Sequence, residues 1–265
     1  MSQVNPQVDV DYLNDFITKY GKKHTHNAEF QRRKLLNIAK QLKNDNPIQG
    51  QLAEASIEFH FCNYDKGIHI LRNVLKLTQN QLAVAWDLLV DAYVQLGDLS
   101  KVFSTYQEYQ NNVEMVTPQT EKVLLHVLRV YQMYEILQKY DFTNVDDINT
   151  VDTIKNNIHK LDQLGISVDV YRNFVALIYR TFYSNFKGTV EQKLFFRENE
   201  LVIRVGTTVD DAHDLFDLTN KYNDQIFEWY GPADDQTKDQ IEKITVYFMH
   251  KVFDTIDPKE YRVLS

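Results

Sequence analysis

The sequence has little of the residues that cross-link, bend or anchor a chain. Cys62 is its only cysteine, so no disulfide can form within the chain, and we expect the reducing cytoplasm as its compartment. Only 8 glycines and 5 prolines interrupt 265 residues, which favours long helices over many short strands. No stretch approaches the roughly 18 apolar residues that span a bilayer, and the first residues lack the apolar core of a secretory signal. We therefore expect a cytoplasmic, mainly helical protein without a membrane partner.

An excess of positive charge is missing as well. The formal net charge is -8, from 29 Lys and Arg against 37 Asp and Glu, which argues against a protein that coats nucleic acid. Aromatic residues are plentiful, with 16 Tyr and 15 Phe, and a chain of this length buries a sizeable core. The composition indicates an acidic protein with ample aromatic surface to bury.

One stretch, residues 82–109, predicts the architecture of the first half. Its apolar residues recur three and four positions apart until Gly97 and Asp98 interrupt them, and a second periodic run follows. Two antiparallel helices joined by a turn account for this pattern. A partial copy, residues 63–67, lies about one repeat upstream, and a further unit after Pro118 has the length and periodicity without the signature residues.

This stretch resembles a tetratricopeptide repeat over about residues 52–116. The positions that carry the resemblance are Trp86, Leu89, Tyr93, Gly97, Val102 and Tyr106. The sequence departs from the repeat at Val90 and Tyr109, where small residues are usual, and at Pro118, which comes late. The resemblance implies a helical-repeat array, an α-solenoid, in which the first helix of each pair lines a concave groove that binds peptide segments.

The resemblance also implies which side chains face the groove. In the register of Trp86 they are Val84, Asp87, Asp91, Val94 and Gln95. The clamp that this family uses for a terminal carboxylate has Lys, Asn and Arg at such places, whereas this chain has two aspartates. We therefore expect a protein or peptide partner of basic or mixed charge. The alternative is that these aspartates are solvated residues of a stack that serves only as a scaffold.

Helical periodicity continues outside the repeat-like region, and then the composition changes. Helices are expected over 9–20, 27–42, 121–140, 152–164 and 168–183. Residues 193–205 hold two short β-favouring runs and predict a hairpin. Two long helices are expected next, over 208–229 and 235–256, the first opened by a capping box of Thr208 and Asp211. This divides the chain into an array (residues 1–185) and a capping segment (residues 186–265) made of a β-hairpin and two long helices.

A basic zone lies near the start of the chain, with a single acid, Glu29, between residues 19 and 43. Its candidate contact residues are Lys22, Lys23, Arg32, Arg33 and Lys34. They could meet the phosphates of a nucleic acid, but no base-reading motif accompanies them. They could instead form a solvated face, or pair with acids of the same chain or of a second copy. We expect no nucleic-acid partner, and homo-oligomerisation stays open.

The sequence shows no motif for catalysis or for a cofactor. Phosphate-binding loops, nucleophile elbows and zinc-protease signatures are all missing. His24 with His26, and His60 with Cys62 and His69, lack the paired spacing of metal sites, so a structural role is favoured. We expect a non-enzymatic interaction module or adaptor with no cofactor and no metal. An enzyme with a site between the two segments, built from residues far apart in sequence, remains an alternative that a polar pocket with perturbed pKa values would favour.

Overall fold

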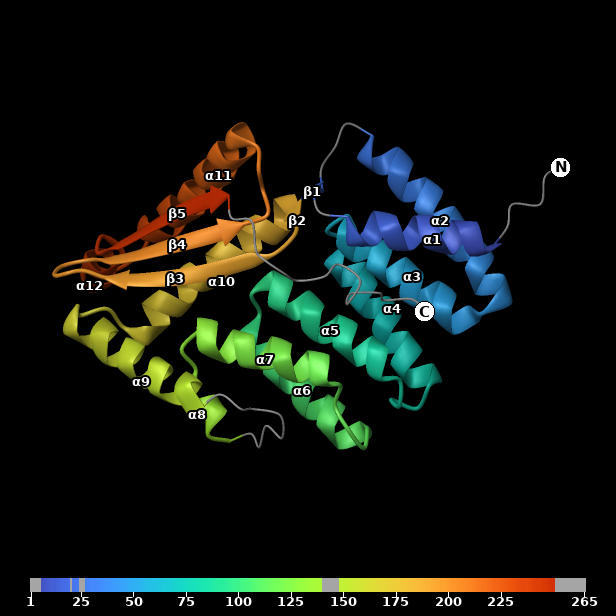
Figure 1. Ribbon diagram of the computed structural model, residues 1–265, viewed down its shortest axis with the longest axis horizontal. Coiled ribbons are helices and arrows are strands. Elements are labelled where there is room, and N and C mark those ends of the chain that lie inside the picture. Colours follow the sequence, from blue (N-terminus) through green and yellow to red (C-terminus); the bar gives the residue numbers. More distant parts are fainter. Residues whose placement is uncertain (1–5, 20, 24–26, 140–147, 251–265) are drawn as a thin grey trace.

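The structure, a computed structural model, describes residues 6–19, 21–23, 27–139 and 148–250. Helices dominate the described chain, and a small sheet lies toward its C-terminal end, as expected (Figure 1). Within these residues, no helix combines the length and the apolar character that crossing a membrane requires.

Two consecutive helical hairpins form, and the second is the one expected around Trp86 (Figure 1). The first pairs α3 (Pro47–His60) with α4 (Tyr64–Leu77), and the second pairs α5 (Ala83–Leu96) with α6 (Leu99–Asn112). Helices α1 (Pro6–Thr18) and α2 (Ala28–Asp45) precede them, and α7 (Pro118–Val130) follows. Helices α3, α5 and α7 begin about 35 residues apart, which is close to the period of the repeat class. Gly97 ends α5 in the left-handed conformation with φ of 67°, and Asp98 caps α6 by accepting a hydrogen bond from the N–H of Lys101 at 3.2 Å.

Aromatic side chains fill the space between these hairpins. The Trp86 ring is 2% exposed, stacks on Tyr109 at 5.9 Å between centroids, and donates its indole N–H to the carbonyl of Asn80 at 2.9 Å. At Gly67, an added Cβ would lie 2.3 Å from the ring of Phe59, so α4 packs on α3 at a distance that only glycine allows. Five of the six residues that carry the repeat resemblance are buried core residues, and the sixth, Gly97, ends α5.

The long helix expected over 121–140 is interrupted. Helix α7 ends at Val130, Gln132 takes a left-handed φ of 52°, and a short α8 (Tyr134–Leu137) follows. The guanidinium of Arg172 fixes this break, because it donates to the carbonyls of Tyr131 and Gln132 at 3.0 and 3.1 Å. Helices α9 (Ile148–Gln163) and α10 (Val168–Asn185) complete the helical part.

The expected hairpin is present, and it forms part of a sheet of three strands. Strands β3 (Val190–Phe196) and β4 (Leu201–Thr207) pair antiparallel, and β5 (Ile244–His250) adds parallel to β4. Helices α11 (Ala212–Tyr230) and α12 (Asp235–Ile241) connect β4 to β5. Asp211, rather than Thr208, caps α11 by accepting from the N–H of Asp214 at 2.9 Å.

The prediction of one long helix over residues 235–256 is wrong. Only Asp235–Ile241 is helical, and Ile244–His250 is a strand, while residues 251–256 lie outside the described chain. The apolar spacing of Ile241, Ile244 and Phe248 fits a helix. The β-branched and aromatic side chains of this segment fit a strand equally well once β4 offers a partner.

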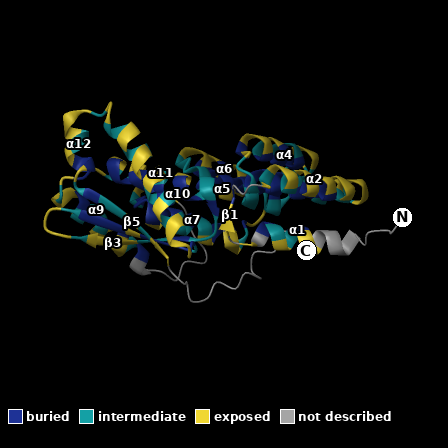
Figure 2. Ribbon diagram, turned by 90° about the horizontal axis from the view of Figure 1, so that it is seen from above, coloured by how far each residue is buried: buried dark blue, intermediate teal, exposed yellow. Residues whose placement is uncertain are grey.

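One face of the sheet is covered and the other is open. Helix α11 packs on the covered face, where the rings of Tyr222 and Phe248 meet at 5.4 Å, and Trp229 joins it to α10 through Phe174, also at 5.4 Å. In Figure 1 the strands lie in front of α10 and α11, and Figure 2 shows the exposed outer sides of α11 and α12.

Two short strands connect the N-terminal part of the chain to the segment that follows α10. Strand β1 (Gly21–Lys22) pairs antiparallel with β2 (Phe186–Lys187), and the N–H of Lys23 donates to the carbonyl of Asn185 at 2.8 Å. Helix α10 contacts both α5 and α11. A division of the chain after residue 185 stays a prediction, and these contacts join the two segments that it would separate.

Candidate functional site

Side chains from four elements meet where β1 and β2 lie against the helical hairpins. Lys23 follows β1, Lys187 ends β2, Tyr64 begins α4, and Asp91 and Gln95 stand one turn apart on α5. We call these five residues the junction cluster. It unites two sets that the sequence kept apart, because Asp91 and Gln95 belong to the expected groove and Lys23 belongs to the basic zone.

A hydrogen-bond relay crosses the junction cluster from an amine to a carboxylate. Lys23 Nζ donates to Tyr64 Oη at 3.3 Å, and the Tyr64 hydroxyl donates to Gln95 Oε1 at 3.0 Å. The Gln95 amide then donates from Nε2 to Asp91 Oδ2 at 2.7 Å. The relay fixes the rotamers of Tyr64 and Gln95 and holds the Asp91 carboxylate in place.

Burial shifts the protonation of the two amines. Lys23 is only 3% exposed, and its burial lowers its pKa, an effect that nearby Asp91 partly offsets. Burial, together with the positive charge of Lys23, lowers the pKa of Lys187 to about 7, although Asp91 favours the charged form. At neutral pH the charged form of the Lys187 amine is therefore less favoured than that of an ordinary exposed lysine.

The Asp91 carboxylate is the part of the junction cluster that reaches solvent. Its side chain is exposed, yet the surrounding protein raises its pKa, while Gln95 and the two lysines oppose that shift. The arrangement can accept a cationic group at Asp91 and an anionic group at the lysines.

Neighbouring His60 and Cys62 are neutral groups at physiological pH. Burial and the nearby lysines lower the pKa of His60 to about 3, and its ring packs against Phe16 at 4.7 Å. Burial raises the pKa of the Cys62 thiol, which donates to the carbonyl of Ser184 at 3.5 Å. His69 is exposed on α4 and bonds to Asn73, so it does not join them.

A metal site is not apparent in the described chain. Within residues 6–19, 21–23, 27–139 and 148–250, no three His, Cys, Asp or Glu side chains are placed to hold a metal ion. His24 and His26, the other candidate pair, lie outside the described residues.

The remaining groove residues do not reach the junction cluster. Asp87 accepts hydrogen bonds from the hydroxyls of Thr117, at 2.9 Å, and Thr120, and so ties α5 to the start of α7. Burial raises the pKa of Asp87, and the two threonines oppose the shift. Val94 is 8% exposed and Val84 is half-buried. Asp87 thus has a structural task, whether or not a partner also contacts it.

Most of the basic zone is paired within the chain. Lys22 forms an ion pair with Asp214 of α11, and Arg32 binds the buried Glu58 through Nε at 3.0 Å and Nη2 at 2.8 Å. The remaining two side chains contact residues nearby: Arg33 pairs with Glu29 at 2.9 Å, and Lys34 lies over the ring of Tyr12 at 4.4 Å. These contacts fit the interpretation in which basic residues pair with groups of the same chain. Contact with nucleic acid is untested.

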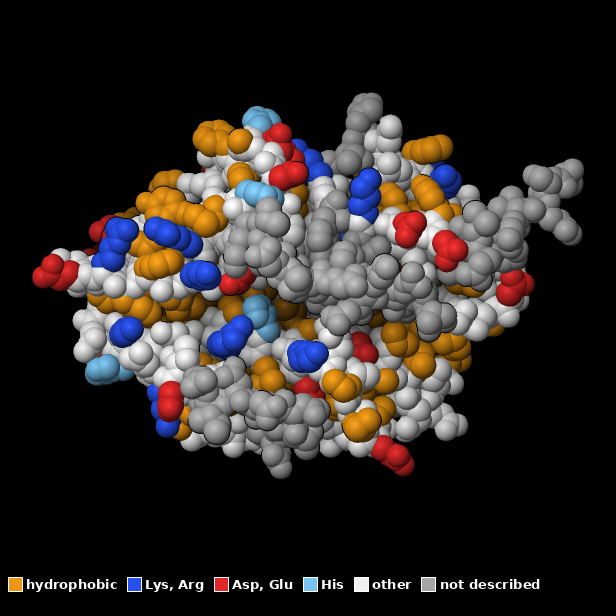
Figure 3. Space-filling model, in the orientation of Figure 1, with side chains coloured by type: hydrophobic (Ala, Val, Ile, Leu, Met, Phe, Trp, Pro, Cys, Tyr) orange, Lys and Arg blue, Asp and Glu red, His pale blue; other side chains and the backbone are white. Residues whose placement is uncertain are grey.

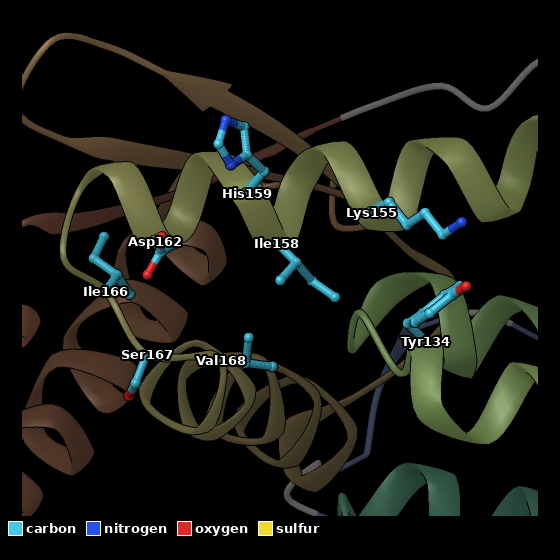
Figure 4. A pocket seen from close by; sticks show the side chains of 8 residues that line it. All are labelled: Tyr134, Lys155, Ile158, His159, Asp162, Ile166, Ser167 and Val168. Atoms are coloured by element: carbon cyan, nitrogen blue, oxygen red, sulfur yellow. The ribbon is translucent and has the colours of Figure 1, made fainter.

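A shallow depression of about 450 Å³ lies between α8, α9 and the start of α10 (Figure 4). It contains Ser167, His159 and Asp162, the residue types of a hydrolytic triad. The geometry is unsuitable, because in Figure 4 His159 points away from Ser167 on the other side of α9. The Ser167 hydroxyl also caps α10 by accepting from the N–H of Val170 at 3.2 Å. These side chains cannot act together as a triad.

Comparison with known proteins gives no match to a family model, a curated protein or a solved structure. The tetratricopeptide resemblance is therefore neither supported nor contradicted by a relative. Two residues of the junction cluster, Tyr64 and Lys187, escaped the sequence analysis. Tyr64 is the first residue of α4, and no local sequence pattern marks it as functional. Lys187 gains its surroundings from the pairing of β2 with β1, which no local pattern encodes.

Proposed function

We propose that this protein is a non-enzymatic interaction module, an adaptor of tetratricopeptide-like build, which binds a protein or peptide segment of mixed charge beside α5. The observation that carries the proposal is the exposed Asp91 carboxylate held next to two largely buried amines. The regular spacing of α3, α5 and α7 supports the adaptor architecture.

The junction cluster has the properties of a prepared binding site. A cationic side chain of the partner would pair with Asp91, and a carboxylate of the partner would be attracted by Lys23 and Lys187. Because the relay through Tyr64 and Gln95 already orders these groups, little conformational entropy is lost when the partner binds. An anion placed beside Lys187 would raise the pKa of its amine, so binding of an acidic group should take up a proton.

The test is a selection from a phage-displayed peptide library on the intact protein, followed by calorimetry on the enriched peptides. Asp91→Asn keeps the size of the side chain and removes its charge, whereas a change at Asp87 would disturb the start of α7. Asp65→Asn, at an exposed position on α4, is the matched control. We expect peptides carrying both charges, with an affinity loss of about tenfold or more in Asp91→Asn and none in Asp65→Asn. Peptides that bind Asp91→Asn as tightly as the parent would refute the site.

A second candidate function is catalysis through an amine. The observation that favours it is the pair of lysines, because a desolvated lysine beside another cation is a good nucleophile toward carbonyl compounds near neutral pH. The Lys187 nitrogen would attack the carbonyl carbon and water would leave, giving an imine.

Trapping with glyoxylate and cyanoborohydride tests this second candidate. The reagent delivers hydride to the imine carbon, and the resulting secondary amine survives for mass spectrometry of the digested protein. Selective labelling of Lys187 at pH 7, lost in Lys187→Arg, supports the reactive amine. Equal labelling of exposed lysines such as Lys40 and Lys76 argues against it.

A further inference from the structure

The open face of the sheet displays apolar and basic side chains together. Phe195, Tyr247 and Met249 are 38%, 54% and 39% exposed there. In the strand register, exposed Lys193, Arg204 and Tyr247 form one row across the three strands, and the Arg204 guanidinium lies 4.5 Å from the centroid of the Phe195 ring. Figure 3 shows these two kinds of side chain gathered over the strands. We call these five residues the sheet patch.

The outer side of α11 displays the complementary combination. Phe216 and Phe227 are 63% and 72% exposed and lie three turns apart on one stripe of the helix. Asp217, Asp224 and Glu228 follow the same side of this stripe, and Asp224 and Glu228 are exposed. We call these five residues the helix patch. It points away from the sheet, since Tyr222 of the same helix packs on Phe248.

We infer that the sheet patch of one molecule binds the helix patch of a second copy of this chain. Each patch leaves large aromatic side chains in water, and the charged residues of the two patches are opposite in sign. Glu191 on the same sheet face and Lys221 on the same side of α11 are the exceptions to this pattern. One contact would bury both sets and pair Lys193 and Arg204 with acids. Exposed aromatic residues within a rim of charge are typical of protein interfaces.

The spacing of the aromatic residues agrees with this contact. Phe216 and Phe227 are separated by about 16 Å along the helix, at 1.5 Å per residue. Phe195 and Met249 lie on the two outer strands and four rows apart, which gives a diagonal of about 16 Å from ordinary strand dimensions. A helix crossing the sheet along this diagonal would place one phenylalanine near each end and pass over Arg204 of the middle strand, with Tyr247 beside it on β5.

The two patches lie on different surfaces of one molecule, so the contact is head-to-tail. A contact of this kind does not close on itself in a dimer, and it builds rings or linear chains of molecules. This assembly goes beyond the proposed binding at the junction cluster and uses none of its residues.

Charge reversal with complementation tests the contact by sedimentation velocity. The sheet variant is Lys193→Glu/Arg204→Glu, and the helix variant is Asp224→Lys/Glu228→Lys. The parent should associate as its concentration rises, and less so in high salt. Each variant alone should show a dissociation constant at least about tenfold higher. An equal mixture should regain association, because each variant then meets a patch of opposite sign. That recovery also shows that both variants are folded.

Matched controls carry the same charge changes at exposed positions elsewhere. Lys40→Glu/Lys76→Glu and Asp45→Lys/Glu114→Lys should associate like the parent. A parent that stays monomeric up to about 1 mM overturns the inference. So does an assembly that neither variant weakens, or a mixture of the two variants that does not recover.

Discussion

At the scale of single residues, the buried carboxylate of Glu58 joins three helices. It is 0% exposed and accepts hydrogen bonds from Arg32 of α2, from Asn63 at 2.8 Å and from Lys66 of α4 at 2.6 Å. Burial alone would raise the pKa of Glu58, but these donors hold it below its ordinary value. Glu58 is therefore an ion-pair centre of the first hairpins, although nothing in its sequence context marks it.

We expect Glu58→Ala to lower the free energy of unfolding by about 2 to 4 kcal/mol, because it leaves charged donors without a shared acceptor. Glu54→Ala is the matched control. Its longer ion pairs, at 3.7 and 3.9 Å, are worth at most about 1 kcal/mol. Urea unfolding measures the free energy of unfolding of both variants. If both variants lose the same stability, Glu58 is not the central ion-pair residue.

The pH dependence of stability provides a second test of the Glu58 carboxylate. Since the pKa of Glu58 is lower in the folded chain, its contribution is complete above the unfolded pKa of about 4.3. That contribution is lost as the pH falls through the lower, folded value. The stability difference between the parent and Glu58→Gln should therefore shrink below about pH 4. A difference that stays constant to pH 2 would show that the charge of Glu58 does not matter.

The periodicity of one helix is enough to put Asp91 and Gln95 side by side, while their part in binding a partner stays a prediction. Asp91 and Gln95 were placed on a common face of α5 from the register of Trp86, and both lie in the junction cluster. Lys187 was missed because its neighbour Lys23 is far away in sequence, and only the β1–β2 pairing brings them together. A depressed lysine pKa depends on such non-local burial.

At the scale of elements, a contact between α10 and the end of α7 explains a break that periodicity does not show. The segment 121–140 has helical spacing throughout, yet Arg172 binds the carbonyls of Tyr131 and Gln132 and pairs with Glu135 at 2.7 Å. These bonds satisfy the end of α7 and orient α8. The break follows from a tertiary contact, so periodicity alone could not reveal it.

We predict that Arg172→Lys destabilises the protein by about 1 to 3 kcal/mol, because an ammonium cannot bridge both carbonyls as a planar guanidinium does. Arg180→Lys, at an exposed position on the same helix, should change little. Thermal unfolding followed by circular dichroism measures both. If Arg172→Lys unfolds at the same temperature as the parent protein, the guanidinium does not fix the break between α7 and α8.

The sheet shows the same limit of local patterns. The sequence predicts the β3–β4 hairpin because its strands are adjacent in sequence and joined by a polar turn. The sequence does not predict strand β5, since its parallel partner β4 lies before α11 and α12. A parallel pair of strands has no connecting turn that the sequence could reveal. Over so short a segment, the same apolar residues also fit both the helical period and the strand period.

At the scale of the whole molecule, α10 makes the array and the C-terminal segment depend on each other. Phe174 of α10 packs on Trp229, Phe182 packs on Phe186 at 6.0 Å, and α10 also contacts α5. An independently folding array would leave these rings in water. We therefore expect one cooperative unit.

The two tryptophans of the chain test this cooperativity, since Trp86 lies in α5 and Trp229 in α11. In Trp229→Phe the fluorescence reports only the array, and in Trp86→Phe it reports only the C-terminal segment. Within each variant, urea midpoints from fluorescence and from circular dichroism should coincide. Separate midpoints in either variant would instead indicate two folding units divided near residue 185.

The most direct measurement is the titration of the Lys187 amine by carbon NMR of labelled lysines, with the signal assigned by its loss in Lys187→Met. The central claim is that Lys23, Asp91 and Lys187 form one electrostatic site. It predicts a pKa for Lys187 of about 7, well below the pKa values of exposed lysines such as Lys40. Lys23→Met should raise that pKa, because a positive neighbour is removed, and Asp91→Asn should lower it. A Lys187 pKa near 10.4 that neither variant moves would contradict the site.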